Sequence, residues 1–114
     1  MVDAKTELET REFVWRAIEI WSHRGKKGVT IANRLTKQNH AFAESLLQRG
    51  ELQETLSPLL NHEAKEVRFA AAAYLHTMGG VASAASMLQA MASSKADLID
   101  IMAAAVLRSA AKRA

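Results

Sequence analysis

The 114-residue sequence predicts an all-α protein, and three observations support that prediction. Alanine, leucine, glutamate, lysine and arginine, which favour helices, are abundant, whereas the chain has one proline and five glycines. β-Branched residues are sparse and never alternate with polar ones, as they would in a half-buried strand. Apolar residues instead recur at three- and four-residue steps, which is the period of a helix with one buried face.

The first helix is expected over residues 6–23. Thr6 and Glu9 have the spacing of a capping box, so the helix should begin at Thr6. Arg24 and Gly25 should end it, because a cation suits the negative end of the helix dipole and glycine adopts the left-handed cap. The helical period assigns the following residues to its buried face: Leu8, Val14, Ala17, Ile18 and Trp21.

The second helix is expected over residues 29–48, with Gly50 closing it. Asn39 falls where an apolar residue is expected, so it should lie at the rim of the core or bond the end of a neighbouring helix. The short connector predicts that the first two helices are antiparallel neighbours. The predicted inward face contains Ile31, Leu35, Phe42 and Leu46.

Four further helices are expected, over residues 51–60, 64–78, 81–92 and from 96 to the basic end. Pro58 lies inside the first of these and removes a backbone hydrogen bond, which predicts a bend. Asn61 is a candidate cap for the next helix, which should stop at the glycine pair of residues 79–80. Ser94 and Asp97 form a weaker capping-box pair before the last helix.

A shift of 32 residues aligns the third and fourth helices with the fifth and sixth. It places Leu56 on Leu88, Val67 on Ile99 and Leu75 on Leu107. A repeat of this length predicts helical hairpins that bury their apolar faces against each other. We therefore expect a single domain, residues 1–114, in which a hairpin at 6–49 precedes repeat-like hairpins at about 51–79 and 81–112.

The Leu59–Leu60 pair, the polar turn after it and the segment EVRFAAAAYL at 66–75 resemble the second-helix motif of HEAT repeats. The Leu-x-Pro-Leu-Leu lead-in and the chain length resemble a small bacterial HEAT-like family of unknown function. The resemblance covers residues 52–78 well and 84–108 more loosely. It implies a right-handed α-α superhelix of about six helices in three antiparallel hairpins.

The same resemblance implies structural roles for three residues, Pro58, Val67 and Arg68. Val67 would pack inward, and Arg68 would pair with acidic groups in the neighbouring turn. Asp100 stands where the second copy would carry the arginine, so a repeated arginine ladder is not expected.

Composition bears on chemistry and location. Without cysteine there can be no disulfide, thiolate metal site or cysteine nucleophile. The sequence shows no secretory start and no apolar run of roughly 20 residues, so we expect a cytoplasmic protein without a membrane span. No metal-binding or catalytic motif is recognisable, so neither an enzyme nor a cofactor is expected. His62 and Glu63 could form a hydrolytic dyad, but a solvated turn is the favoured interpretation.

Charge is segmented along the chain. Residues 20–43 contain five bases and no acid, whereas acids predominate in the segments on both sides. These cations are a candidate anion or nucleic-acid patch, and an ordinary solvated surface is the competing, favoured interpretation. The patch comprises Arg24, Lys26, Lys27, Arg34 and Lys37.

The aromatic residues Phe13 and Trp15 are the other candidate site. If the first helix lies at an edge, one of them is exposed and can anchor a partner. The leading hypothesis is a non-enzymatic protein-interaction module of the regulator, adaptor or toxin-antagonist type, as a monomer or homodimer. Nucleic-acid binding through the basic residues of 24–37 is the alternative, and an enzyme using His62 is the least favoured.

Overall fold

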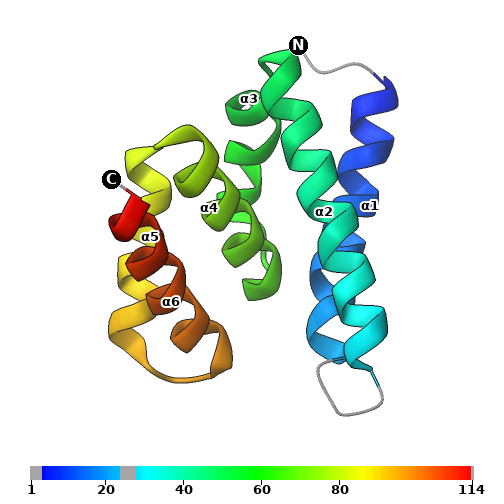
Figure 1. Cartoon of the computed structure of the whole chain (residues 1–114). Helices are drawn as coiled ribbons and strands as arrows, with labels where there is room; N and C mark the ends of the chain where they lie inside the picture. The colour runs from blue at the N-terminus through cyan, green and yellow to red at the C-terminus, as the bar shows by residue number, and fades with distance from the viewer. Residues whose placement is uncertain (1–3, 24–27, 114) are drawn as a thin grey trace. The chain divides into compact units, whose positions relative to one another are not determined.

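A computed structural model describes residues 4–23 and 28–113 and confirms an all-α protein (Figure 1). The chain divides into two compact units, residues 1–55 and 56–114. None of the described helices is both long and apolar enough to cross a bilayer. The elements are α1 (Ala4–Ser22), α2 (Val29–Arg49), α3 (Leu52–Leu56), the 3₁₀ helix η1 (Ser57–Asn61), α4 (Lys65–Gly79), α5 (Ala82–Ser94) and α6 (Leu98–Arg113).

Helix α1 differs from the expectation at its start and in its buried face. It begins at Ala4, so Thr6 lies inside the helix and is not its cap. Leu8 is 60% exposed, which contradicts its assignment to the core. The buried residues are Thr6, Phe13, Ala17 and Ile20. The helix is therefore turned so that Phe13 faces α2, where its ring packs on Phe42, while Ala17 is buried as expected.

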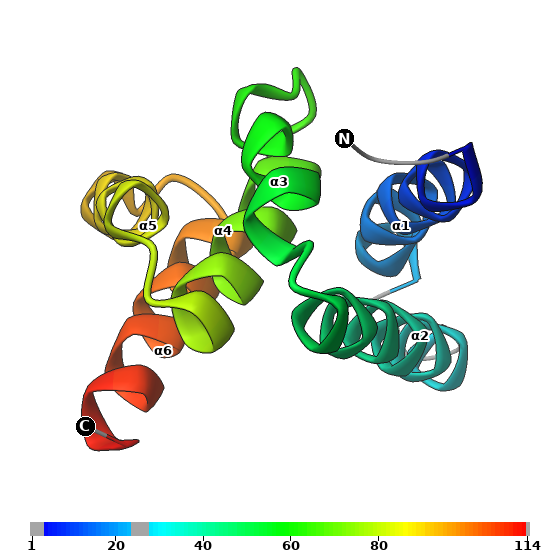
Figure 2. The same cartoon turned by 90° about the horizontal axis from the view of Figure 1, so that it is seen from above.

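Helices α1 and α2 run antiparallel and side by side (Figures 1 and 2). The rings of Phe13 and Phe42 meet between them with their centroids 5.8 Å apart. Helix α2 ends at Gly50, which has a left-handed φ of 72° and donates its backbone N–H to the last turn. The proposed end of α1 at Arg24 and Gly25 lies outside the described residues.

Asn39 is a buried polar residue in the contact between α1 and α2. It is 1% exposed, and its Nδ2 donates a hydrogen bond of 3.2 Å to the backbone oxygen of Phe13. Arg16 Nε in turn donates to Asn39 Oδ1 at 2.6 Å. Asn39 thus bonds the middle of the neighbouring helix and not its end. Because its amide nitrogen and its amide oxygen each have a hydrogen-bond partner, the side chain can be buried without a large cost.

At Pro58 the chain changes from an α-helix to a 3₁₀ helix. Helix α3 ends at Leu56, and Pro58 lies in the first turn of η1. This position suits proline, because the first turn of a helix needs no N–H donor there. The bend expected at Pro58 is therefore a change to the tighter 3₁₀ helix. Leu60, near the end of η1, is buried.

Helix α4 starts without the cap predicted at Asn61. Asn61 is the last residue of η1, and Ala64 precedes α4 without a side-chain cap. The turn is held instead by His62 Nδ1, which accepts from the Ala64 backbone N–H at 3.0 Å. Gly80, with a left-handed φ of 61°, closes the other end of α4.

Helix α5 packs against both α4 and α6, which also contact each other (Figures 1 and 2). Several buried positions follow the 32-residue shift: Leu56 and Leu88 are fully buried, as are Ala71 and Ala103. Leu75 departs from it, because Leu75 is buried and Leu107 is only partly buried. Val67 is likewise fully buried, and Ile99 is 8% exposed. Helix α6 is preceded by Asp97, whose Oδ1 accepts from the Asp100 N–H at 3.0 Å, so Asp97 pairs with Asp100 and not with Ser94.

Candidate interaction surfaces

Two of the five predicted patch cations lie within the described residues, and they share one face of α2. Arg34 and Lys37 are both exposed, three residues apart on successive turns. Arg24, Lys26 and Lys27 lie outside the described residues. Among the described residues, the structure therefore brings Arg34 and Lys37 together. An open hollow on this face is lined by Thr30, Asn33, Arg34, Lys37, Gln38 and Ala41; we call these six residues the α2 polar face.

The α2 polar face contains no acid. Neither Arg34 nor Lys37 forms an ion pair with another described residue. The first turn of α2 has no acidic side chain, and its N-cap residue, Gly28, makes no side-chain cap bond. The positive end of the helix dipole is therefore not opposed by an acid in the first turn, which contains Thr30, whereas Arg34 and Lys37 lie in later turns.

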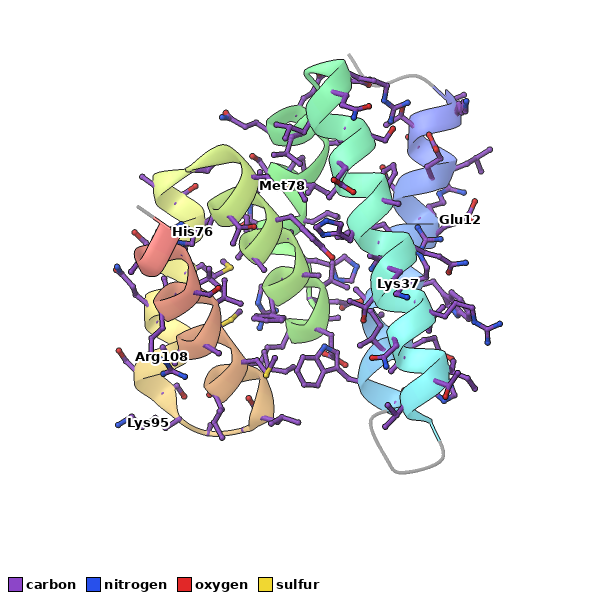
Figure 3. All side chains as sticks on the ribbon, viewed as in Figure 1. Glu12, Lys37, His76, Met78, Lys95 and Arg108 are labelled. Carbon is purple, nitrogen blue, oxygen red and sulfur yellow. The ribbon has the colours of Figure 1, made fainter. Side chains whose placement is uncertain are left out.

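A second hollow, between α1 and α2, adjoins the α2 polar face and shares Gln38 and Ala41 with it. Glu9 and Glu12 line it from the α1 side, and Glu12 lies on the helix beside the one that holds Lys37 (Figure 3). Both carboxylates are paired, Glu12 with Arg16 at 3.6 Å and Glu9 with Arg49 at 3.7 Å, so the described residues that line this second hollow have no free charge of either sign.

The two candidate aromatics have opposite environments. Phe13 is fully buried against Phe42, which contradicts its use as a partner contact. Trp15 is 57% exposed and stays a candidate. Leu8 is seven residues earlier, close to two helical turns, so it projects from the same side of α1 as Trp15. Ala17 and Phe13 lie on the other side, so Leu8 and Trp15 form an outer face of α1.

In the second unit, sequence reasoning missed an ionic cluster. Lys65 Nζ lies 2.9 Å from Asp97 Oδ2, to which it donates a hydrogen bond, and 2.9 Å from Asp100 Oδ1. The Asp100 side chain is fully buried, whereas those of Lys65 and Asp97 are 28% and 45% exposed. Asp100 Oδ2 also accepts from the Ala96 N–H at 2.8 Å. One signal was available: the 32-residue shift places Lys65 on Asp97 and Arg68 on Asp100, with opposite charges at both positions.

These contacts determine the ionisation of the cluster. The hydrogen bond from Lys65 holds the pKa of Asp97 below its usual value. It does the same for the pKa of Asp100, against an opposing contribution from burial. The bonds to Asp97 and Asp100 raise the pKa of Lys65. All three groups are thus charged at neutral pH.

Arg68 holds the turn before α4. Its Nη1 donates to the backbone oxygens of His62 at 2.8 Å and Glu63 at 2.9 Å. Among the described residues its partners are therefore carbonyls and not the acidic groups that the resemblance implied. His62 and Glu63 thus contribute their backbone oxygens to the hydrogen bonds that hold this turn. Within the described part of the chain, no group of three His, Asp or Glu side chains is arranged to hold a metal ion.

A small hollow lies beside this cluster and has a volume of about 290 Å³. Ligand pockets typically have roughly 300–1,000 Å³, and the charged residues at this hollow are already engaged, Lys65 with Asp100 and Arg68 with two backbone carbonyls. It therefore favours no ligand class. It is lined by Lys65, Arg68, Met87, Ala90, Met91, Ser94 and Asp100.

No family model matches the chain, and no curated protein or solved structure matches it either.

Proposed function

We propose that the protein is a non-enzymatic protein-interaction module that binds a partner, as a regulator, adaptor or antagonist does, through the outer face of α1. The observation that supports this proposal is the exposure of Leu8 and Trp15, 60% and 57%, on the side of the helix away from Phe13. Apolar residues at this spacing are how a helix is recognised by a groove or by another helix.

The energy available at this face favours a macromolecular partner. Covering the exposed half of a tryptophan removes about 100 Å² from water, which is worth about 2–3 kcal/mol at 25 cal/mol/Å². Tryptophan is also among the residues that most often dominate binding at protein interfaces. Leu8 adds a second apolar anchor two turns away, so a partner would contact α1 along its length and not at a single point.

The scaffold in the second unit fits the same role. We propose that its two hairpins are HEAT-like repeats within a right-handed superhelix, because several of their buried positions recur at the 32-residue shift. Stacked hairpins present extended faces and suit macromolecular partners better than small substrates.

The test compares the full chain with two double variants in affinity capture from the cells that express it. Leu8→Ala with Trp15→Ala removes the outer face of α1. Val29→Ala with Leu47→Ala is the matched control, because those residues of α2 are 47% and 46% exposed. We expect one stoichiometric partner with the wild type and the control, lost with the α1 variant. The purified partner should then bind the α1 variant at least tenfold more weakly. Equal capture by all three proteins would refute the proposal.

A further inference from the structure

We infer that the α2 polar face binds the phosphodiester backbone of a nucleic-acid duplex. This is a second binding surface, on a different helix from the one in the proposed function, and it rests on different residues. Arg34 and Lys37 supply two unpaired cations among the described residues. Thr30, Asn33 and Gln38 place hydroxyl and amide donors around them in one hollow.

The arrangement suits a row of phosphates. Arginine and lysine supply the charge, and hydroxyl and amide groups supply additional hydrogen bonds to phosphate oxygens. Residues on neighbouring turns of one helix face have Cβ atoms roughly 5–6 Å apart, so Arg34 and Lys37 can contact successive phosphates. Residues 30–38 extend over about 12 Å of helix, which matches three or four nucleotides of one strand at about 3.4 Å each.

The extent of the contact follows from the neighbouring charges. Glu9 and Glu12 line the adjoining hollow and pair there with Arg49 at 3.7 Å and Arg16 at 3.6 Å, so the described residues of this hollow offer no unpaired cation to a backbone that continued past Ala41. At the other end, the start of α2 has the positive dipole end and no acid. The strand is therefore expected to lie over the first half of α2.

The composition of the face also indicates the kind of nucleic acid. Proteins that prefer single strands stack bases on aromatic side chains, and the α2 polar face contains none. Its contacts are therefore to the backbone, independent of base sequence. We expect a duplex to bind at least as tightly as a single strand of the same length.

The experiment measures fluorescence anisotropy of a labelled 20-base-pair DNA duplex titrated with the full chain at 50 mM salt. The test variant is Arg34→Gln with Lys37→Gln. The matched control is Lys5→Gln with Arg11→Gln, which removes one lysine and one arginine from exposed positions on α1. Circular dichroism and urea unfolding verify that both variants fold like the wild type.

We expect micromolar binding by the wild type and the control, and binding at least tenfold weaker by the test variant. The slope of log K against log salt should become shallower by about 1.8 in the test variant, since each phosphate contact on duplex DNA contributes about 0.9. The inference is wrong if the wild type shows no binding at 50 mM salt, or if both variants lose affinity equally. A test variant that binds like the wild type also refutes it, as does a single strand bound more than tenfold tighter than the duplex.

Discussion

Lys65 and Asp100 form an ion pair of 2.9 Å between two helix starts that are 35 residues apart in the sequence. The carboxylate of Asp100 is fully buried, whereas the ammonium of Lys65 is 28% exposed. The charge of Asp100 is thus taken out of water and compensated by one side chain from α4, together with the Ala96 N–H. Through Asp97 and Asp100, this arrangement attaches the start of α4 to the loop before α6 and to the first turn of α6.

Removing Lys65 should destabilise the protein because it leaves a buried carboxylate without its cation. Lys65→Met is expected to lower the unfolding temperature by several degrees, whereas Lys5→Met, at an exposed position, should leave it almost unchanged. Lys65→Met combined with Asp100→Asn should cost less than the sum of the two single changes, since no charge is then left unpaired. Thermal unfolding followed by circular dichroism measures all four variants; additive losses would show that the two residues are not coupled.

The cluster also predicts a pH dependence. Lys65 lowers the pKa of Asp97 and Asp100 in the folded protein below their usual 3.8. The folded state therefore binds these protons less readily than the unfolded chain. The resulting stability is fully present above the unfolded pKa and is lost as pH falls through the folded values. Urea unfolding at pH 7 and pH 3 should show a larger acid loss for the wild type than for Lys65→Met. Equal losses would contradict this assignment.

Tyr74 offers a direct optical test of burial. It is the chain's one tyrosine, and burial raises the pKa of its phenol to about 12. Ultraviolet absorbance of tyrosinate should therefore titrate near 12 in the folded protein and near 10 in urea. Because the folded pKa is raised, the stability that depends on the neutral phenol is present below pH 10 and is lost as pH increases beyond it. A folded midpoint at 10 would mean that Tyr74 is solvated.

Asn39 should be needed for the pairing of α1 with α2. Asn39→Ala leaves Arg16 Nε without its acceptor and creates a small cavity, and we expect a loss of about 1–3 kcal/mol in the free energy of unfolding. Asn33→Ala is the matched control on the same helix, because Asn33 is exposed; it should change stability by less than about 0.5 kcal/mol. Urea unfolding distinguishes the two, and similar small effects would show that the buried amide contributes little.

Phe13 and Trp15 should behave in opposite ways although they are two residues apart. Phe13→Ala removes a buried ring and should cost about 3–5 kcal/mol of stability. Trp15→Ala should change stability much less, because more than half of its side chain is already in water. Chemical denaturation of both variants measures the difference. A large loss for Trp15→Ala would mean that this residue belongs to the core, and the proposed partner surface would then be wrong.

The helical class and most helix ends follow from local signals in the sequence. Gly50 and Gly80 end α2 and α4 because glycine adopts a left-handed φ without steric cost, and that property needs no distant partner. The apolar face of α2 was likewise readable at Leu35, Phe42 and Leu46, since a helix of 21 residues repeats its period several times.

Tertiary structure decided which side of α1 is buried and how the polar residues are satisfied. Phe13 and Trp15 are both aromatic, and only the position of Phe42 on another helix selects Phe13 for the core. Asp100 is buried because Lys65, from a different helix, approaches it. Residue spacing specifies the period of a helix but not its rotation or its distant neighbours. Those depend on contacts between elements far apart in the chain, and these contacts also determine which surfaces are left for a partner.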